Sequence, residues 1–135
     1  MLYPMAIVRA IIPDEQGRVL ILKRQQTGHS AGAWCLPGGK VQYNETIEQA
    51  LEKELSEETS LTCTEAEYLF YQDSLPSKPG DMHCINFYFR CSVTGEVALN
   101  DESCDFAWVG EEEIGDYDIV FRNDLALLRY WEEQA

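Results

Sequence analysis

Three glutamates, Glu54, Glu57 and Glu58, have a spacing that brings them together on one face of a helix. At about 100° per residue they continue the apolar stripe that begins with Ile47 and Leu51, so they extend the face that should be buried. Like charges at this spacing repel one another, and the helix macrodipole disfavours anions near the C-terminus. The pattern therefore predicts a cation between them. Oxygen ligands without histidine or cysteine favour Mg²⁺ or Mn²⁺ over zinc.

A helix and the glycines before it must position these carboxylates. Thr46 and Gln49 form the pattern of a capping box, and good helix formers continue to about Thr59 without proline or glycine. Gly38 and Gly39 lack side chains and allow the backbone to approach a ligand closely. We therefore expect a loop, a helix and a second loop to form the site.

The segment from Gly39 to Leu61 resembles the Nudix box, G-x5-E-x7-R-E-U-x-E-E-x-G-U, in which U is aliphatic. Five residues separate Gly39 from Glu45, and seven more lead to the run Lys53-Glu54-Leu55-Ser56-Glu57-Glu58-Thr59-Ser60-Leu61. Every acidic position matches, whereas Lys53 replaces the family's arginine and Ser60 its second glycine. The preceding run Trp34-Cys35-Leu36-Pro37-Gly38-Gly39 is similar to the family's W-x-L-P-G-G lead-in.

The resemblance implies an α/β fold, the Nudix α/β/α sandwich, in which a mixed sheet lies between helices. It also implies a metal-dependent hydrolase that cleaves a phosphoanhydride bond by attack of water on phosphorus. The substrate would be a nucleoside diphosphate linked to another moiety X. Oxidised or ordinary nucleoside triphosphates, nucleotide sugars and dinucleotides all fit this description, and the sequence does not choose among them.

The resemblance further assigns roles to individual residues. Glu54, Glu57 and Glu58 would hold the metal together with the Gly39 carbonyl, and Glu54 or Glu57 would double as the general base. Glu102 is a further candidate, because mutator-type members often keep an acidic residue in this connection that reaches the metal or the attacking water. The alternative for Glu102 is a carboxylate on a surface loop.

Four residues outside the carboxylate group are candidates for binding the substrate. Lys40, Arg24 and Arg9 carry the positive charge that phosphate groups need, although each of them can also be an ordinary surface charge. Asn123 is either the N-cap of the last helix or, as the resemblance implies, a residue that reads the edge of a purine.

Two functions of other classes remain open. Lys53, which we count among the catalytic candidates, keeps the charge of the family's arginine but loses the planar fork that can orient a glutamate. This departure allows a nucleotide-binding sensor with weakened or absent turnover. A metal-dependent interaction protein would instead need an exposed apolar patch. Metal-dependent release of phosphate or pyrophosphate from a panel of nucleotides separates the hydrolase from both.

Composition limits the other partners and the location. With 135 residues, 45% of them hydrophobic, the chain suits one domain over residues 1–135. The net charge of −14 argues against duplex nucleic acid and anionic membranes, because both require a basic surface. Five cysteines without zinc spacing and an N-terminus unlike a signal peptide indicate a reduced, cytoplasmic protein. The oligomeric state stays open, a homodimer included.

Apolar runs and turn residues predict the remaining elements. Strands are expected at residues 5–12 and 18–24, which would form a hairpin, and at residues 68–73, 83–93 and 105–109. The acidic residues 111–113 are expected to start a short helix. The last helix is expected at residues 121–133, with Leu125 and Leu128 facing inward and Tyr130 and Trp131 as further candidates for that face. The loop at residues 74–81 contains enough turn residues to be mobile and to border the substrate.

Overall fold

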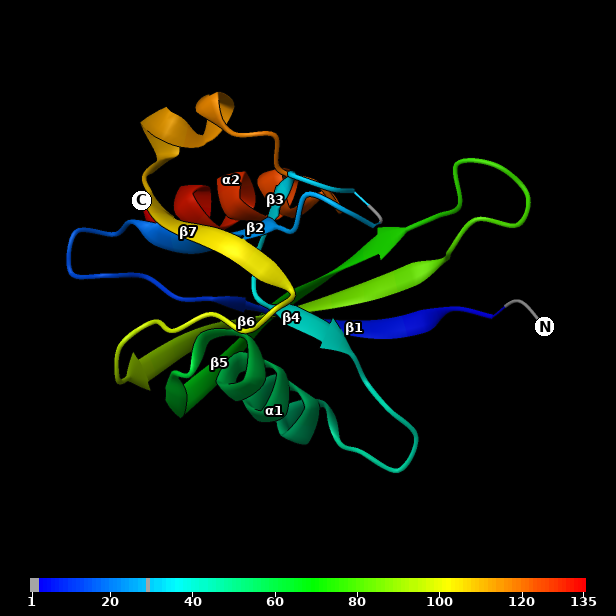
Figure 1. Ribbon diagram of the computed structural model, residues 1–135, viewed down its shortest axis with the longest axis horizontal. Coiled ribbons are helices and arrows are strands. Elements are labelled where there is room, and N and C mark those ends of the chain that lie inside the picture. The colour runs from blue at the N-terminus through cyan, green and yellow to red at the C-terminus, as the bar shows by residue number, and fades with distance from the viewer. Residues whose placement is uncertain (1–2, 29) are drawn as a thin grey trace.

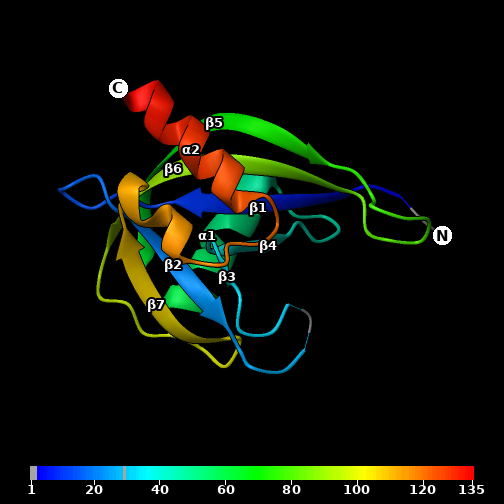
Figure 2. The ribbon, with the colours of Figure 1, turned by 90° about the horizontal axis from the view of Figure 1, so that it is seen from above.

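Two β-sheets form the centre of the protein, and helices cover both sides of them (Figures 1 and 2). The computed structural model describes residues 3–28 and 30–135. In chain order, the elements are β1 (Met5–Ile11), β2 (Val19–Arg24), β3 (Trp34–Cys35), β4 (Gly38–Lys40), α1 (Ile47–Thr59), β5 (Thr62–Ser74), β6 (Cys84–Thr94), β7 (Ser103–Val109), the 3₁₀ helix η1 (Glu111–Asp116) and α2 (Asn123–Gln134).

The larger sheet has the strand order β4-β1-β6-β5, and the smaller sheet has the order β3-β2-β7. β1 and β6 are parallel, whereas β1 pairs with β4, and β5 with β6, in antiparallel fashion. One side of the larger sheet packs with α1 and the other with α2. The α/β sandwich with a mixed sheet between helices is therefore confirmed. The separate antiparallel sheet is an addition to the single sheet that the sequence predicts.

β1 and β2 do not form the predicted hairpin. They meet next to their connecting turn, where Pro13 bridges to Val19 and the Leu20 amide donates to the Ile12 carbonyl over 3.2 Å. Beyond this point β1 pairs with β4 and β6, and β2 pairs with β3 and β7. Both strands are largely buried, so each gains more by pairing with strands from elsewhere in the chain. The apolar pattern of the two segments does not show that each of them pairs with a distant strand.

The helix α1 agrees with the sequence prediction. The Thr46 hydroxyl accepts a hydrogen bond from the Gln49 amide, and the Gln49 side chain accepts one from the Thr46 amide, which completes the capping box. Leu51 and Leu55 are buried against the larger sheet. The helix ends at Ser60, whose φ of 66° is left-handed. This arrangement brings the last turn of α1 next to β4.

The helix α2 buries a different face from the predicted one. Leu125 and Leu128 are 47% and 40% exposed, so the prediction that they face inward is wrong. The buried stripe consists of Asn123, Ala126, Leu127 and Tyr130, so the expectation for Tyr130 is confirmed. These residues have proper helical spacing, but the stripe begins with a polar side chain and continues with a small one. A search for large apolar residues therefore selects the neighbouring face.

β5 and β6 form a long antiparallel pair at the side of the larger sheet. β6 lies between β1 and β5, as its alternating pattern predicts. β5 is longer than the predicted strand at residues 68–73, because its polar first half is an exposed edge held by pairing with β6. The connection at residues 75–83 projects from one end of the molecule, near the start of β1 (Figures 1 and 2).

The short helix predicted at residues 111–113 is η1. Among the residues that the structure describes, no helix combines the length and the apolar character needed to cross a membrane.

Candidate active site

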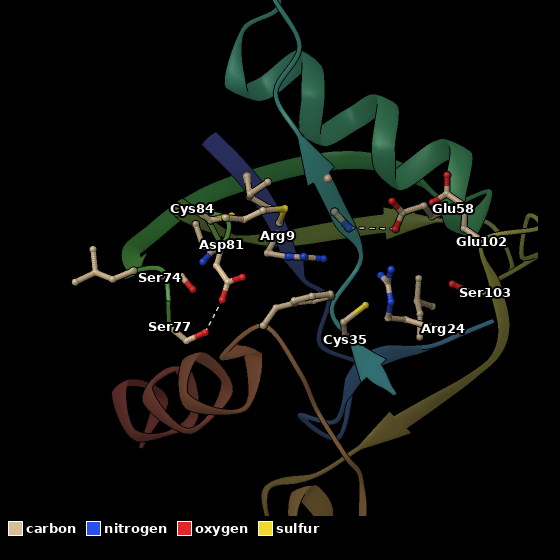
Figure 3. Close-up of a pocket in the computed structure, with 18 of the residues that line it drawn as sticks. Arg9, Arg24, Cys35, Glu58, Ser74, Ser77, Asp81, Cys84, Glu102 and Ser103 are labelled. Carbon is tan, nitrogen blue, oxygen red and sulfur yellow. Dashed lines mark hydrogen bonds between the residues drawn. The ribbon is translucent and has the colours of Figure 1, made fainter. Parts of the chain in front are cut away.

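A cavity of about 750 Å³ lies where the two sheets, the end of α1 and the 75–83 connection meet. Gly38, Gly39, Glu58 and Glu102 line one end of it. Residues of the 75–83 connection and the first residues of β6 line the other end. Figure 3 shows the carboxylates of Glu58 and Glu102 together at the first end, with Arg24 below them. The cavity is therefore acidic at one end and has a cationic wall beside it.

Glu58 is the most deeply placed carboxylate of this site. Its side chain comes from the last turn of α1, and the residue is 7% exposed. The Gly38 amide donates to Glu58 Oε1 over 3.2 Å (Figure 3). Burial, and then a hydrogen bond with the Glu54 carboxyl, raise the pKa of Glu58 from 4.5 to about 9. In the metal-free protein Glu58 is therefore protonated at neutral pH.

Glu54 lies one turn earlier on the same helix and packs directly on Gly39. A Cβ at position 39 would lie 2.6 Å from Glu54 Cδ and 2.7 Å from its Oε2. Burial is also the main reason that the pKa of Glu54 is raised, and the neighbouring Glu57 adds to it. Gly39 is thus required for the close approach of the Glu54 carboxylate to the backbone of β4.

The Glu54 and Glu58 carboxyls fit a divalent cation. The two carboxyls lie close enough to perturb each other, and the raised pKa of Glu58 keeps a proton on it. A cation in that region would replace the proton and relieve the repulsion between the two carboxylates. In the described part of the chain, no three histidine, cysteine, aspartate or glutamate side chains converge as they stand. A third ligand must therefore come from a side-chain rotation or from the Gly39 carbonyl.

Glu57 and Glu102 are the carboxylates nearest in the structure that could join Glu54 and Glu58 as ligands of the cation. Both add negative potential at Glu54. Glu57 is exposed, which differs from the expectation that all three helix glutamates lie on the buried side. The reason is angular, because Leu55 and Glu58 take the centre of the buried face and Glu57 falls at its edge. Glu102 is also exposed and lies beside Glu58 at the acidic end (Figure 3).

Arg9 and Arg24 form the cationic wall. Each guanidinium lies 5.1 Å from the centroid of the same Phe121 ring. Arg9 is 9% exposed and donates from Nη1 to the Leu36 carbonyl over 2.9 Å. Its Nε has no hydrogen-bond partner among the described residues. Two cations held at one aromatic ring, next to the carboxylates, create a site for an anionic group.

Lys53 and Lys40 are not part of the cavity lining. Lys53 Nζ contacts Glu45 Oε2 over 2.8 Å, and Glu45 also accepts from the Gln42 amide over 2.8 Å. Lys53 therefore fastens the loop between β4 and α1 and does not orient a glutamate of the acidic end. Lys40 is exposed at the end of β4.

Asn123 is fully buried and lies behind the cavity wall. Its Oδ1 accepts from the Leu36 amide over 2.9 Å, and its Nδ2 donates to the Tyr88 hydroxyl and to the Phe121 carbonyl, both over 3.2 Å. The N-cap of α2 is Arg122, so the cap prediction for Asn123 is wrong. Its side chain holds the neighbouring backbone in place and presents no free group to a purine.

Comparison with known proteins agrees with this geometry. A family model described as NUDIX domain matches residues 4–130. The chain belongs to the NUDIX family. Nucleoside triphosphatase NudI from Escherichia coli O139:H28 is 32% identical over 122 residues, which cover 84% of this chain and 86% of that protein. The Nudix assignment also makes the protein a pyrophosphohydrolase that acts on acid anhydrides.

Solved structures confirm the Nudix fold. The MutT protein from Methanosarcina mazei Go1 superposes with a TM-score of 0.86 at 26% identity, covering 98% of this chain and 96% of that one. The NUDIX domain of Shewanella oneidensis NrtR, determined with ADP ribose, has a TM-score of 0.77 at 18% identity and covers 100% and 91%. The second similarity shows the fold alone.

Several residues that line the cavity of this Nudix chain were not among the site candidates from the sequence, and Asp81, Asn86 and Phe121 are the most relevant of them. Asn86 carried a signal, since it is a polar residue on an inward face of a central strand. Asp81 belongs to the loop at residues 74–81 that was expected to border the substrate, but the sequence did not single it out within that loop. No sequence feature indicated Phe121, because its position depends on how the turn before α2 folds back onto the sheet.

Proposed function

We propose that the protein, acting as one domain over residues 1–135, hydrolyses nucleoside triphosphates with Mg²⁺ or Mn²⁺. The observation that supports this most directly is the placement of two carboxyls, Glu54 against Gly39 and Glu58 on the Gly38 amide, beside the cationic wall of Arg9 and Arg24. A nucleotide polyphosphate with its bound metal complements both parts of the site: the metal pairs with the carboxyls, and the phosphates pair with the two arginines. Five free cysteines agree with a reducing, cytoplasmic location.

Glu54, Glu58 and the Gly39 carbonyl are the groups that would hold the cation, with Glu57 as the remaining ligand. When bound, the cation neutralises the diphosphate and lowers the pKa of water. Gly39 keeps the Glu54 carboxylate against β4, and the Gly38 amide fixes one oxygen of Glu58. These contacts position the acidic groups before the substrate arrives, so little reorganisation is needed during the reaction.

The other residues bind and position the substrate. Arg24 and Arg9 would contact phosphate oxygens, and the Phe121 ring limits the movement of both guanidiniums. Glu54 is the best placed general base, because it is half-buried and its pKa is raised. Glu57 and Glu102 are exposed alternatives for accepting the proton. Lys53 contributes to substrate positioning indirectly, because its ion pair with Glu45 holds the loop between β4 and α1.

The choice of nucleoside triphosphates follows from the relatives. NudI carries the name nucleoside triphosphatase, and it is similar to this chain over most of its length. The NrtR domain shows that a related fold binds ADP ribose, which is also a nucleoside diphosphate linked to another group. Both ligands share the diphosphate that the acidic end and the cationic wall would bind.

Turnover of a nucleotide panel tests the proposal. Nucleoside triphosphates, nucleotide sugars and dinucleotides are incubated with Mg²⁺, Mn²⁺ or EDTA, and phosphate, pyrophosphate and nucleoside monophosphate are measured separately. We expect release from triphosphates with either metal and none in EDTA. Glu52→Gln is the matched control for Glu58→Gln, because Glu52 is exposed on the outer side of α1.

Turnover in EDTA, or loss of activity in both glutamate variants, would contradict the proposed site. Binding of nucleotides without any turnover would instead support a sensor.

A further inference from the structure

The end of the cavity opposite Glu58 contains polar groups that the hydrolytic function does not use. Asn86, on β6, and Asp81, on the 75–83 connection, both line the cavity, and Asn86 is two residues from Cys84, which lies at this end (Figure 3). Figure 3 shows Asp81 pointing into the cavity at the end away from Glu58. Leu75 and Met82, which are 70% and 58% exposed, border the same end. Two polar groups between apolar borders are the features of a site for a flat, polar ring.

Asn86 is buried and has no protein partner for its amide. The residue is 2% exposed, and it faces the same side of the larger sheet as Ile7, its neighbour in β1. Among the described residues, no hydrogen bond engages its side-chain amide. Arg9 Nε is the enclosed polar atom without a partner among the described residues, so the Asn86 amide is open to the cavity, where a bound group can exchange hydrogen bonds with it.

The Asp81 carboxylate can accept hydrogen bonds from a ligand but cannot donate them. Ser77 Oγ donates to Asp81 Oδ2 over 2.7 Å, which orients the carboxylate and leaves Oδ1 for another donor. No lysine or arginine in the described chain forms a salt bridge with it. An ionised carboxylate only accepts hydrogen bonds, whereas an asparagine amide both donates and accepts. Asp81 therefore requires a hydrogen-bond donor on the ligand, whereas Asn86 can pair with either a donor or an acceptor.

We propose that Asp81 and Asn86 read the base of the nucleotide and select bases that carry an exocyclic amino group. This inference rests on the proposed function, which places the polyphosphate at the opposite end of the cavity. The amino group of cytosine or adenine donates to Asp81, and the adjacent ring nitrogen accepts from Asn86. Uracil and hypoxanthine present a carbonyl at the amino position, and its oxygen would repel the Asp81 carboxylate.

The apolar residues at this end explain why the discrimination would be strong. Ile7 lines the cavity beside Asn86, and Leu75 and Met82 line it from the 75–83 connection, so all three can contact a bound ring. Covering the ring removes water from the Asp81 carboxylate, so a mismatched carbonyl cannot be rescued by solvent. Sites that leave a buried polar group unpaired reject the wrong ligand far more strongly than apolar pockets do.

The experiment compares nucleotides that differ in the amino group. We measure kcat/KM for CTP against UTP and for ATP against ITP, and Kd for CMP against UMP by calorimetry with the metal-free protein. Because a hydrogen bond to a charged group is involved, we expect the amino member of each pair to be favoured at least about tenfold. Equal values, or a preference for the carbonyl member, would overturn the inference.

Two variants separate the roles of the residues. Asp81→Asn, whose amide can donate as well as accept, should reduce the preference in each pair to less than about threefold. Asn86→Leu keeps the volume and should raise KM for both members of a pair about tenfold, with little effect on kcat. Asp116→Asn, at an exposed position of η1, is the control and should change neither value. Melting curves verify that each variant is folded.

The readouts distinguish this inference from the proposed function. If no triphosphate is hydrolysed but CMP still binds more tightly than UMP, the proposed function fails and base selection stands. If triphosphates are hydrolysed with equal efficiency and Asp81→Asn changes nothing, base selection fails and the proposed function stands.

Discussion

The two helices cover opposite sides of the larger sheet, but they begin in different ways. α1 begins with a capping box between Thr46 and Gln49, four residues of local sequence that satisfy their own backbone. α2 follows two consecutive left-handed residues, Phe121 and Arg122, with φ of 63° and 59°, and it has no side-chain cap. The Asn123 side chain instead holds the Leu36 amide and the Phe121 carbonyl.

This difference separates the two chemical parts of the site. The carboxylates follow from spacing within α1, whereas the cationic wall depends on the turn before α2. Left-handed backbone in a residue such as phenylalanine costs roughly 1–3 kcal/mol. That strain is offset in part by placing the Phe121 ring against Arg9 and Arg24. The acidic end depends on residues close together in the sequence, whereas the cationic wall depends on contacts between distant segments. Mutations in the two regions should therefore have different effects.

The largest effect is expected at the locally encoded end. Glu58→Gln removes a metal ligand and should lower kcat/KM by about 10²–10³-fold, since preorganised charge contributes effects of that size. Turnover of the nucleotide panel at fixed Mg²⁺ measures this loss. A loss of less than tenfold would show that Glu58 has a structural role and that the cation lies elsewhere.

The same variant makes a prediction about pH. The pKa of Glu58 is raised to about 9 in the metal-free folded protein, so the folded state holds a proton that the unfolded state releases. In EDTA, the contribution of Glu58 to stability should be greatest below about pH 4.5 and decrease as pH rises towards 9, by at most about 1.4 kcal/mol per pH unit. Glu58→Gln should lack this contribution. Thermal melts of both proteins from pH 5 to 9, with and without Mg²⁺, test it, and parallel curves would contradict a protonated Glu58.

The second largest effect concerns the two adjacent glycines. Gly39→Ala places a Cβ 2.6 Å from Glu54 Cδ, and the flexible glutamate should move away. Activity should then fall by about tenfold or more, while stability changes by less than about 1 kcal/mol. Gly38→Ala is the comparison, because its Cβ would overlap the Val8 carbonyl oxygen, which cannot move easily. It should destabilise the fold itself. Similar melting temperatures for both variants would show that the two positions are not distinct.

A third prediction addresses the tertiary cationic wall. Phe121→Ala removes the ring that Arg9 and Arg24 share, and each cation–π contact contributes about 0.5–2 kcal/mol. KM for triphosphates should rise about tenfold, with little change in kcat, because the carboxylates are untouched. Steady-state kinetics separates the two constants. A fall in kcat at unchanged KM would show that this turn positions the reacting groups.

The same comparison explains how far the sequence could predict this molecule. The sequence predicted the capping box, the end of α1 and the central strand β6, because each depends on residues close together in the chain. For the acidic residues it predicted the inward placement of Glu54 and Glu58 but not the exposure of Glu57. The pairing of β1 and β2 with distant strands was not predictable in this way. The buried face of α2 was missed because Asn123, a polar residue, begins it.

The residues of the candidate site also fall into two groups, those close together in the sequence and those from distant segments. Glu54, Glu58 and Gly39 meet because a helix and a strand connected by one short loop bring them together. Arg9, Arg24 and Phe121 come from three distant segments, so no spacing rule could show that both arginines contact one ring. Lys53 was assigned from its place in the box, and its actual partner, Glu45, is a contact that only the folded loop reveals.

The contact between Lys53 and Glu45 leads to a smaller prediction. Lys53→Arg should leave kcat and KM within about twofold of wild type, because arginine can also reach an exposed carboxylate without touching the acidic end. Lys53→Ala, which releases the loop, is the comparison and should lower activity modestly. A large increase in kcat for Lys53→Arg would mean that an arginine here orients Glu54 or Glu57, and the structural role given to Lys53 would be wrong.

The smallest effect is expected at Ser60, where two terms of similar size oppose each other. Its φ of 66° is left-handed, and glycine would relieve a strain of about 1 kcal/mol. However, Ser60 Oγ donates to the Ala98 carbonyl over 2.9 Å, and a hydrogen bond of this kind contributes about 0.5–1.5 kcal/mol. Ser60→Gly loses the bond and the strain together, so its melting temperature should stay within about 2 °C of wild type. Ser60→Ala loses the bond and keeps the strain, and should melt about 3–4 °C lower. Equal melting temperatures for the two variants would show that the left-handed backbone at Ser60 costs nothing, and a Ser60→Ala variant as stable as wild type would show that the bond to Ala98 contributes nothing.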